Sequence, residues 1–248
     1  MRKVVLVTGA SAGIGTACAV GAAKAGYDVA VAYGRDSDGA EATARAVREA
    51  GGRAEIVQAD MATPEGPDVL FQGFDAAFDR LDALINNAGI VDVAARVEDM
   101  SQERLSRMFQ INVVAPMRVA GLAVKRMSTK HGGAGGVIVN LSSVAARLGS
   151  ANQFVDYAAS KGAIDSFNKG LADEVAGEGI RVAAVRPGLI DTAIHAKGGD
   201  PDRAQRLAHM IPMGRTGSAA EVAATVLWLM SDAASYVTGT TLDVSGGR

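Results

Sequence analysis

The chain has 248 residues, of which 48% are hydrophobic, so it can bury a sizeable core without disulfide bonds. Its 25 Lys and Arg residues and 27 Asp and Glu residues give a formal net charge of -2, which lacks the basic excess typical of proteins that bind nucleic acid or anionic membranes. The one cysteine, Cys18, excludes an intramolecular disulfide, and no apolar run is long enough to span a bilayer, so we expect a cytoplasmic protein.

Short runs rich in Val and Ile alternate with longer amphipathic stretches. The short runs are almost continuously apolar, which is typical of parallel strands that are covered on both faces. We expect strands at residues 4–8, 28–33, 54–58, 84–86, 137–141, 181–185 and 241–244. We expect helices at residues 13–25, 39–50, 68–79, 101–129, 157–176 and 219–231. This alternation predicts an α/β protein, a single domain over residues 1–248 with one doubly wound parallel sheet in three layers.

Residues 191–217 are the most irregular stretch, with a turn predicted at Gly198-Gly199-Asp200-Pro201. We interpret this stretch as a surface lid over the ligand site. In an open parallel sheet the ligand lies outside the carboxyl ends of the strands. The residues that follow each strand are therefore the candidates for function.

The first strand leads into a glycine-rich loop, residues 8–15, that precedes the first helix. Gly9 permits a tight turn, Gly13 removes a side chain where a phosphate approaches the backbone, and Gly15 lets helix and strand pack closely. The free N–H groups at the start of a helix suit a pyrophosphate. A purely structural turn is the alternative, but a nucleotide site is the stronger interpretation at this place in a βαβ series.

The end of the second strand indicates which nicotinamide cofactor is preferred. A carboxylate there would bind the ribose 2′-hydroxyl, but this strand ends in Tyr33-Gly34-Arg35. Arg35 can bind a 2′-phosphate through charge-assisted hydrogen bonds, which favours NADP(H). The alternative is a solvated loop charge, because Asp36 and Asp38 follow closely.

Tyr157 and Lys161 are four residues apart in a predicted helix, so they share one face. An ammonium close to a phenol, together with the positive charge of an oxidised nicotinamide, favours the phenolate. Tyr157 can then act as a general acid in carbonyl reduction or as a base in alcohol oxidation. By itself this spacing also arises by chance on a helix surface.

Two further sites support the pair. The strand at 137–141 ends in Ser142-Ser143, where a hydroxyl can hydrogen-bond a substrate oxygen. Asn112 lies among apolar residues of the preceding helix. It is either a satisfied core amide or the holder of a water that links Lys161 to solvent.

With these motifs in this order and at this spacing, the sequence resembles a classical short-chain dehydrogenase/reductase over essentially its whole length. The residues that carry the resemblance are 8–15, Asp60, 86–89, Asn112, Ser143, Tyr157, Lys161, 187–188 and 236–239. The resemblance implies a Rossmann-type fold and hydride transfer between a nicotinamide cofactor and a carbonyl or secondary alcohol.

The resemblance also implies a catalytic group of Ser143, Tyr157 and Lys161, with Asn112 as fourth member. We choose Ser143 over Ser142 because strand alternation turns Ser142 the other way. The expected cofactor is NADP, with NAD as the alternative. Its expected contacts are Gly9, Ser11, Gly13, Ile14, Gly15, Tyr33, Arg35, Asp60, Met61, Asn87, Ala88, Gly89, Tyr157, Lys161, Pro187, Gly188, Ile190 and Thr192.

Two branches of the family come closest. The segment DYAASKGA, residues 156–163, suggests glucose-1-dehydrogenase-like proteins, and the general layout suggests 3-oxoacyl-[acyl-carrier-protein] reductases. The chain departs from the reductases at Ala12, where they usually carry Arg, and at Glu178, where they usually carry a basic residue. A sugar or small ketone is thus the expected substrate, with the acyl-carrier reaction as the alternative.

The remaining expectations concern partners. His131, His195 and His209 lack metal-ligand spacing, so we expect no metal. We expect neither nucleic acid nor membrane as a partner, and the resemblance implies a homotetramer. A cofactor-binding sensor without turnover is a further alternative, although such proteins usually lose a catalytic residue and all four are present here.

Overall fold

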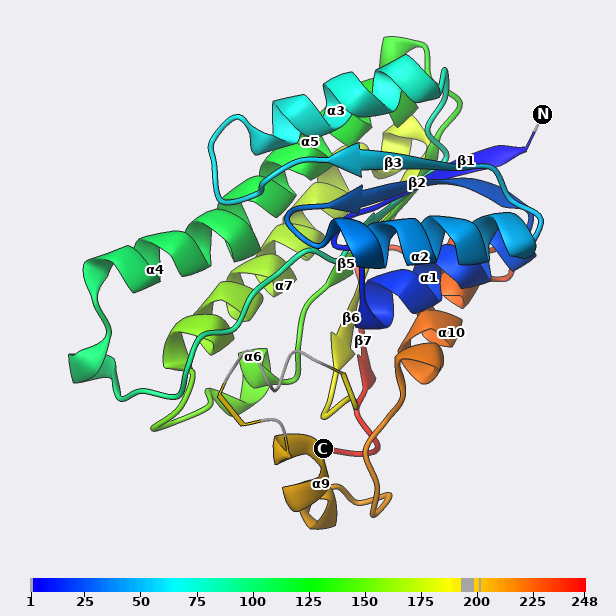
Figure 1. Ribbon diagram of the computed structural model, residues 1–248. Helices are drawn as coiled ribbons and strands as arrows, with labels where there is room; N and C mark the ends of the chain where they lie inside the picture. The colour runs from blue at the N-terminus through cyan, green and yellow to red at the C-terminus, as the bar shows by residue number, and fades with distance from the viewer. Residues whose placement is uncertain (1, 193–198, 201) are drawn as a thin grey trace.

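The computed structural model describes residues 2–192, 199–200 and 202–248, and its centre is one sheet of parallel strands (Figure 1). The strands are β1 (Lys3–Val7), β2 (Tyr27–Tyr33), β3 (Ala54–Gln58), β4 (Ala83–Asn86), β5 (Gly136–Leu141), β6 (Ile180–Pro187) and β7 (Thr241–Val244). They are ordered β3-β2-β1-β4-β5-β6-β7 and all pairs are parallel. The predicted doubly wound α/β fold is confirmed, with strand limits within three residues of those expected.

Helices cover both faces of the sheet (Figure 1). Helices α1, α2 and α10 pack on one face and α3, α5 and α7 on the other, each set around its own apolar core. The helices are α1 (Gly13–Lys24), α2 (Ser37–Glu49), α3 (Gly66–Ala77), α4 (Gln102–Phe109), α5 (Ala115–Met127), α6 (Ala145–Leu148), α7 (Val155–Val175), α9 (Arg203–Arg206) and α10 (Ala219–Met230). Short 3-10 turns connect several of them.

Strand β1 shows why the strand sequences are continuously apolar. Val5 and Val7 belong to the core under α1, α2 and α10, whereas Val4 and Leu6 belong to the core under α3, α5 and α7. Successive side chains of a strand point to opposite faces. Because both faces of β1 are buried, every position is apolar rather than every second one.

The prediction of one continuous helix over 101–129 is wrong. A π-helical segment, Gln110–Val114, separates α4 from α5. Pro116 follows it at the start of α5, and proline has no N–H to donate to the carbonyl four residues earlier, at Asn112. The π-helical turn is wider than an α-helical one, and it forms where this hydrogen bond is missing. The interruption therefore falls at Asn112, one of the predicted catalytic residues.

The strand order reverses between β1 and β4, and in such sheets the ligand crevice lies beside this reversal, at the carboxyl ends of the strands. Part of the predicted lid lies here. Ile190 forms a bridge with Gly217, and the Met213 N–H donates to the Gly246 carbonyl at 3.1 Å. Residues 193–198 and 201 of the predicted lid, His195 among them, lie outside the described residues.

Cys18 lies on the buried side of α1, where burial raises the pKa of its thiol to about 12. Such a thiol remains protonated and unreactive at neutral pH. Among the described helices, none combines the length and the apolar run that crossing a bilayer requires.

Candidate active site

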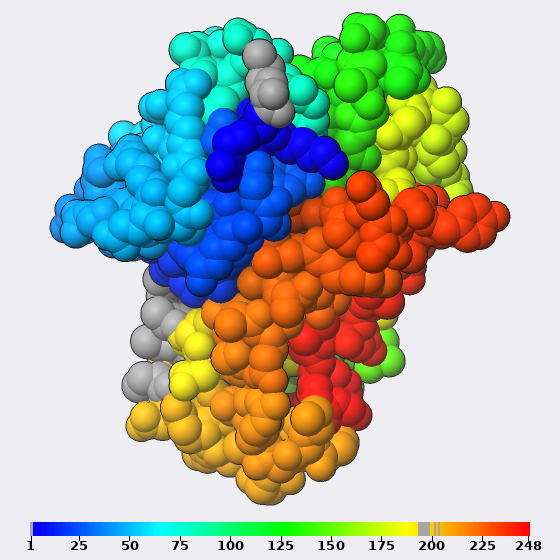
Figure 2. All heavy atoms as spheres, turned by 90° about the vertical axis from the view of Figure 1, so that its right-hand side faces the viewer, coloured from blue at the N-terminus to red at the C-terminus, as the bar shows by residue number. Residues whose placement is uncertain are grey.

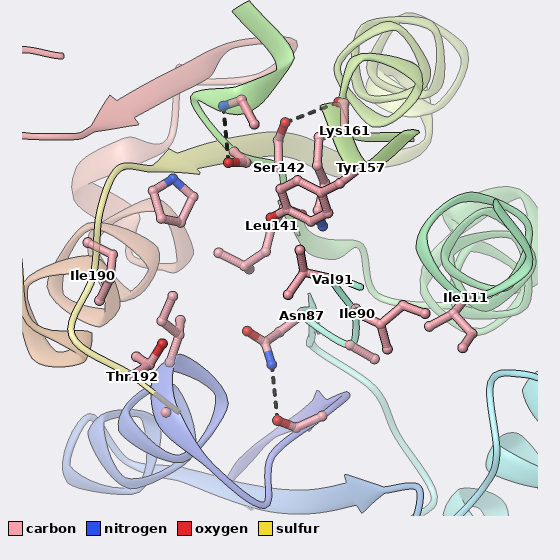
Figure 3. Close-up of a pocket in the computed structure, with 18 of the residues that line it drawn as sticks. Asn87, Ile90, Val91, Ile111, Leu141, Ser142, Tyr157, Lys161, Ile190 and Thr192 are labelled. Carbon is pink, nitrogen blue, oxygen red and sulfur yellow. Dashed lines mark hydrogen bonds between the residues drawn. The ribbon is translucent and has the colours of Figure 1, made fainter. Parts of the chain in front are cut away.

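A cavity of about 1020 Å³ opens at the carboxyl ends of the strands. Every predicted catalytic or cofactor residue lines it except Gly15 and Asn112. In Figure 3, Tyr157 and Lys161 of α7 enter the cavity from one side, and Asn87 and Thr192 lie across it. The sequence motifs, though distant along the chain, thus converge on one cavity.

The glycine loop presents a helix N-terminus to this cavity. Helix α1 begins at Gly13, its N-cap Ala12 makes no side-chain capping bond, and its first turn has no acidic residue. Gly9 has a φ of +64°, which a residue with a side chain rarely adopts. The backbone N–H groups of the first turn are thus available to an anion. This cradle fits the pyrophosphate of a dinucleotide.

Gly15 acts behind the loop rather than in the cavity. A Cβ atom at this position would lie 2.3 Å from the carbonyl oxygen of Gly9. The absence of a side chain therefore lets α1 pack against its own loop. Any larger residue would displace the cradle.

Asn87 and Thr8 fasten the loop to the end of β4. The Thr8 hydroxyl accepts the N–H groups of Asn87 at 2.9 Å and of Ala88 at 3.0 Å. In return, Asn87 Nδ2 donates to the carbonyls of Thr8 at 2.9 Å and Gly9 at 3.1 Å. The cradle is thereby held rigid before any ligand arrives.

Arg35 lies at the rim of the cavity. Its guanidinium is 3.5 Å from the Asp60 carboxylate, and 80% of its side chain is exposed. Such an exposed pair contributes little free energy, so Arg35 can turn toward an anionic ligand. Asp36, which the sequence offered as a competing partner, instead caps α2 by accepting the Gly39 N–H at 3.0 Å.

Tyr157 and Lys161 share one face of α7. The Lys161 ammonium is 5.8 Å from the centre of the Tyr157 ring and donates to the Leu141 carbonyl at 2.7 Å. Ser142 donates its hydroxyl to the Lys161 carbonyl at 3.2 Å, whereas Ser143 lies close enough to the Tyr157 phenol to lower its pKa. Ser142 thus ties α7 to β5, and Ser143 faces the phenol.

Burial controls the protonation of this pair. It raises the pKa of the Tyr157 phenol above its usual value, although the neighbouring Ser143 hydroxyl lowers it. It also lowers the pKa of Lys161 to about 8, against the opposing effect of Asp165. We expected Lys161 to favour the phenolate, but in the protein without a cofactor the desolvation of the Tyr157 phenol is the larger effect. At neutral pH the phenol is protonated and can donate a proton.

Asn112 is fully buried and its side chain is occupied. Its amide exchanges two hydrogen bonds with the main chain of Ile90, at 2.8 and 2.9 Å, and donates to Ser160 at 3.1 Å. Asn112 Oδ1 and Lys161 Nζ flank the same glycine, Gly89, at 3.3 and 3.5 Å from a Cβ built there. The structure gives Asn112 the role of anchoring this loop, and its part in a proton relay stays a prediction.

The loop that follows β4 forms one wall of the cavity and is fastened at three points. Besides Ile90, the Val93 carbonyl accepts a hydrogen bond from Arg104 at 2.7 Å, and the Ala95 N–H donates to the Gln153 carbonyl at 2.9 Å. Arg104 also makes a buried bidentate ion pair with Asp156, at 2.7 and 3.3 Å. Asp156 in turn accepts the N–H of Tyr157 at 2.9 Å. These contacts connect the loop to the first turn of α7.

Sequence reasoning missed several residues that line the cavity, because no motif contains them. They are Ile90, Val91, Leu148, Ala151, Gln153 and Phe154. The available signal was proximity along the chain, to the motif at 86–89 for the first two and to Ser143 and Tyr157 for the others. Within the described part of the chain, no group of three or more His, Cys, Asp or Glu side chains could hold a metal ion.

Comparisons with known proteins agree with this geometry. The family model described as enoyl-(acyl carrier protein) reductase matches residues 9–248. The chain is 48% identical over 245 residues to the uncharacterized oxidoreductase YgfF of Escherichia coli (strain K12), covering 99% of both. It is 42% identical to 3beta-hydroxysteroid dehydrogenase 1 of Eggerthella lenta, covering 99% of this chain and 93% of the relative.

Both branches suggested by the sequence occur among the relatives. A glucose 1-dehydrogenase 2 of Bacillus subtilis is 37% identical, and a 3-oxoacyl-[acyl-carrier-protein] reductase of Synechocystis is 36% identical. The crystal structure of the angucycline C-6 ketoreductase LanV with bound NADP superposes with a TM-score of 0.91 at 34% identity, covering 99% of this chain and 95% of that one. The chain therefore belongs to the short-chain dehydrogenase/reductase family, whose members are oxidoreductases that use NAD or NADP.

Proposed function

We propose that this protein interconverts a ketone and a secondary alcohol with NADP(H) as cofactor. The observation that carries the proposal is the convergence of Ser143, Tyr157 and Lys161 on the cavity that the glycine loop enters. The test is NADPH consumption by the purified protein with a panel of ketones. Turnover is expected; tight NADPH binding without turnover of any substrate would favour the sensor instead.

The chain's own residues account for orientation and proton transfer. A bound nicotinamide cofactor supplies the hydride. Ser143 hydrogen-bonds the carbonyl oxygen, and the Tyr157 phenol donates its proton to that oxygen as negative charge develops. The Lys161 ammonium stabilises the phenolate that remains, and it would also hold the ribose of a bound cofactor. In the alcohol direction, Tyr157 accepts the same proton.

The proposed preference for NADP(H) rests on Arg35. Its exposed guanidinium at the rim can make a bidentate contact with a 2′-phosphate. Asp60, 3.5 Å away, is 41% exposed and opposes the negative charge of that phosphate. Arg35 must therefore turn from Asp60 to the ligand, which is inexpensive for a solvated pair.

Arg35→Asp should reverse the cofactor preference. The variant loses the phosphate contact and gains a carboxylate that repels the 2′-phosphate and accepts the ribose hydroxyls. We expect kcat/KM for NADPH to fall about 100-fold relative to NADH, which corresponds to the loss of about 3 kcal/mol from charge-assisted bonds. Arg53→Asp, at an exposed position away from the cavity, is the control. An unchanged NADPH-to-NADH ratio in Arg35→Asp would count against the phosphate role.

The cavity wall favours a ketone with apolar substituents over a sugar. Its walls near Tyr157 come from Val91, Val144, Leu148, Phe154 and Leu189. A sugar carries a hydroxyl on nearly every carbon, and each buried hydroxyl without a partner costs about 1–3 kcal/mol. Gln153 and Ser150 are among the polar side chains that also line the cavity. Rates with aromatic or cyclic ketones are thus expected to exceed the rate of glucose oxidation.

The acyl-carrier alternative has little support at the surface. Glu178 accepts the Ser128 hydroxyl at 2.5 Å and lies 4.0 Å from Lys130. A carboxylate in this position weakens the basic patch that an acidic carrier protein would need. Reduction of a free ketone at a higher rate than the carrier-bound thioester would support the ketone proposal.

A homotetramer is proposed on the basis of two exposed apolar surfaces. One, over α4 and α5, carries Phe109, Val114 and Met117; the other, over α10 and the segment after it, carries Trp228 and the fully exposed Tyr236. Figure 2 shows the face formed by α1, α2 and α10, with the segment after α10 standing out from the body. Exposed apolar side chains gathered on one face are typical of protein interfaces. Two distinct faces suit a tetramer with two kinds of contact.

Light scattering should therefore give a mass of four times 25.3 kDa. Trp228→Asp should dissociate the tetramer to dimers by placing a charge at one interface. Val69→Asp, at an exposed apolar position on α3, is the control and should leave the mass unchanged. A monomeric wild-type protein would contradict the proposal.

The buried thiol of Cys18 is compatible with the proposed cytoplasmic setting.

A further inference from the structure

Asp165 is a largely buried carboxylate that the proposed mechanism does not use. It lies four residues after Lys161 on α7, so Tyr157, Lys161 and Asp165 follow one another along a single helix face. Its side chain is 16% exposed. One oxygen, Oδ2, accepts the Arg186 guanidinium at 2.9 Å, whereas the buried Oδ1 has no hydrogen-bond partner among the described residues. A half-satisfied carboxylate at this place costs free energy, so its presence calls for a function.

Asp165 begins a chain of alternating charges that crosses four elements. Arg186 of β6 contacts both Asp165 and, at 3.3 Å, Asp243 of β7. Arg186 and Asp243 are also direct neighbours in the register of the two strands. Arg147 of α6 completes the chain, 2.8 Å from Asp243. Two carboxylates and two guanidiniums balance within it, so Lys161 is flanked by a network with no net charge.

We propose that Asp165 is a positioning residue of the active site: its carboxylate, fixed by Arg186 one helical turn from Lys161, keeps the Lys161 side chain in its charged form. The proposal rests on the function proposed above, because it assigns Lys161 to proton transfer. Side chains of a helix lean toward its N-terminus, so the Asp165 carboxylate leans over the turn that begins at Lys161. A carboxylate this near stabilises a buried ammonium.

Among the described residues, Asp165 is the carboxylate whose charge acts on the Lys161 ammonium. Tyr157 shares its helix, the Leu141 carbonyl accepts its proton from β5, and Asn112 approaches it across Gly89. The remaining acid near Tyr157, Asp156, is already paired with Arg104. Burial lowers the pKa of Lys161 to about 8, and Asp165 acts in the opposite direction. Without Asp165, therefore, more of the lysine is neutral at physiological pH.

The decisive variant is Asp165→Asn, which keeps the shape and an oxygen for Arg186 but removes the charge. The variant removes a negative charge near Lys161 and leaves two guanidiniums against one carboxylate in the network. Each of these two changes lowers the pKa of Lys161. A loss of one carboxylate shifts such a group by about one unit. The alkaline limb of the pH profile of kcat/KM should move down by this amount, so that activity falls about fivefold at pH 8 and less than twofold at pH 6.

A second measurement needs neither cofactor nor substrate. The lysine side chains are labelled with ¹³C at Cε, and their NMR shifts are followed with pH in the protein alone; Lys161→Arg identifies the resonance. We expect the Lys161 midpoint to be lower in Asp165→Asn and restored in Asp165→Glu. Asp173→Asn, which removes an exposed carboxylate paired with Lys169 on the same helix, should leave it unchanged.

An identical Lys161 midpoint in wild type and Asp165→Asn would overturn the proposal. So would an activity loss of equal size at every pH, which indicates a structural role only. If Asp165→Asn does not fold, Asp165→Ser gives the same comparison, because Arg186 retains Asp243 as its partner. Absence of turnover in the wild type would overturn the proposed function, while the NMR titration would still decide the role of Asp165.

Discussion

Tyr157→Phe should reduce kcat for ketone reduction about 1000-fold, since positioned general acids contribute roughly 10²–10⁴-fold. The substitution removes the phenol O–H and leaves the ring against the Lys161 chain. Binding of NADPH, measured by fluorescence titration, should change less than about twofold because the glycine loop and Arg35 are untouched. The loss should therefore appear in kcat rather than in cofactor affinity.

Tyr236→Phe provides the matched control for this substitution. Tyr236 lies on the segment after α10 and does not line the cavity. Phenylalanine keeps its ring at the proposed interface, so loss of the hydroxyl should leave kcat unchanged. Equal rates for Tyr157→Phe and the wild-type protein would remove Tyr157 from the mechanism. The enzyme would then need another proton donor in the cavity, although Ser143 and Lys161 would still surround the substrate oxygen.

Arg104→Ala should have the largest effect on stability. The Arg104 and Asp156 side chains are 10% and 0% exposed, and removal of one partner leaves the other charge buried and unpaired. Such a loss destabilises a protein by about 3–5 kcal/mol. For a chain of this length, the melting temperature should fall by roughly 10 °C, as measured by calorimetry or circular dichroism. The activity should fall too, because Asp156 holds the first turn of α7 through the Tyr157 N–H.

Arg96→Ala is the control for the loss of an arginine. Arg96 pairs with Glu98 at the surface, where both side chains are more than half exposed, so its removal should cost less than about 1 kcal/mol. In the Arg104→Ala background, Asp156→Asn should recover part of the loss since no charge remains buried. Equal melting temperatures for Arg104→Ala and Arg96→Ala would show that the buried pair does not stabilise the fold.

Much of this architecture follows from local sequence pattern. The seven apolar runs became strands because a two-sided sheet admits almost no polar residue within them, and the glycine loop followed from its position after β1. The spacing of Tyr157 and Lys161 sufficed to put both on one face, because a helix turns once in 3.6 residues. These features depend on neighbours along the chain, which a sequence displays directly.

The features that escaped prediction depend on residues far apart along the chain. Arg104 and Asp156 are 52 residues apart, and Asp165 and Arg186 are 21 apart, so their contacts exist only once helices and strands have packed. The π-helical segment had a local signal in Pro116, which also suits the first turn of a new helix. The pKa of Tyr157 depends on burial by the surrounding elements, and spacing alone carries no information about it.

The triple fastening of the loop after β4 has a consequence for changing what the enzyme accepts. Because Ile90, Val93 and Ala95 are each tied by hydrogen bonds to a helix or to the segment before α7, this wall is pre-organised and selects molecules by its fixed outline. Insertions or deletions here would break the ties and disturb Tyr157. Redesign of selectivity is better directed at the side chains of Val91 and Leu148, which face the cavity and can be exchanged while the backbone stays in place.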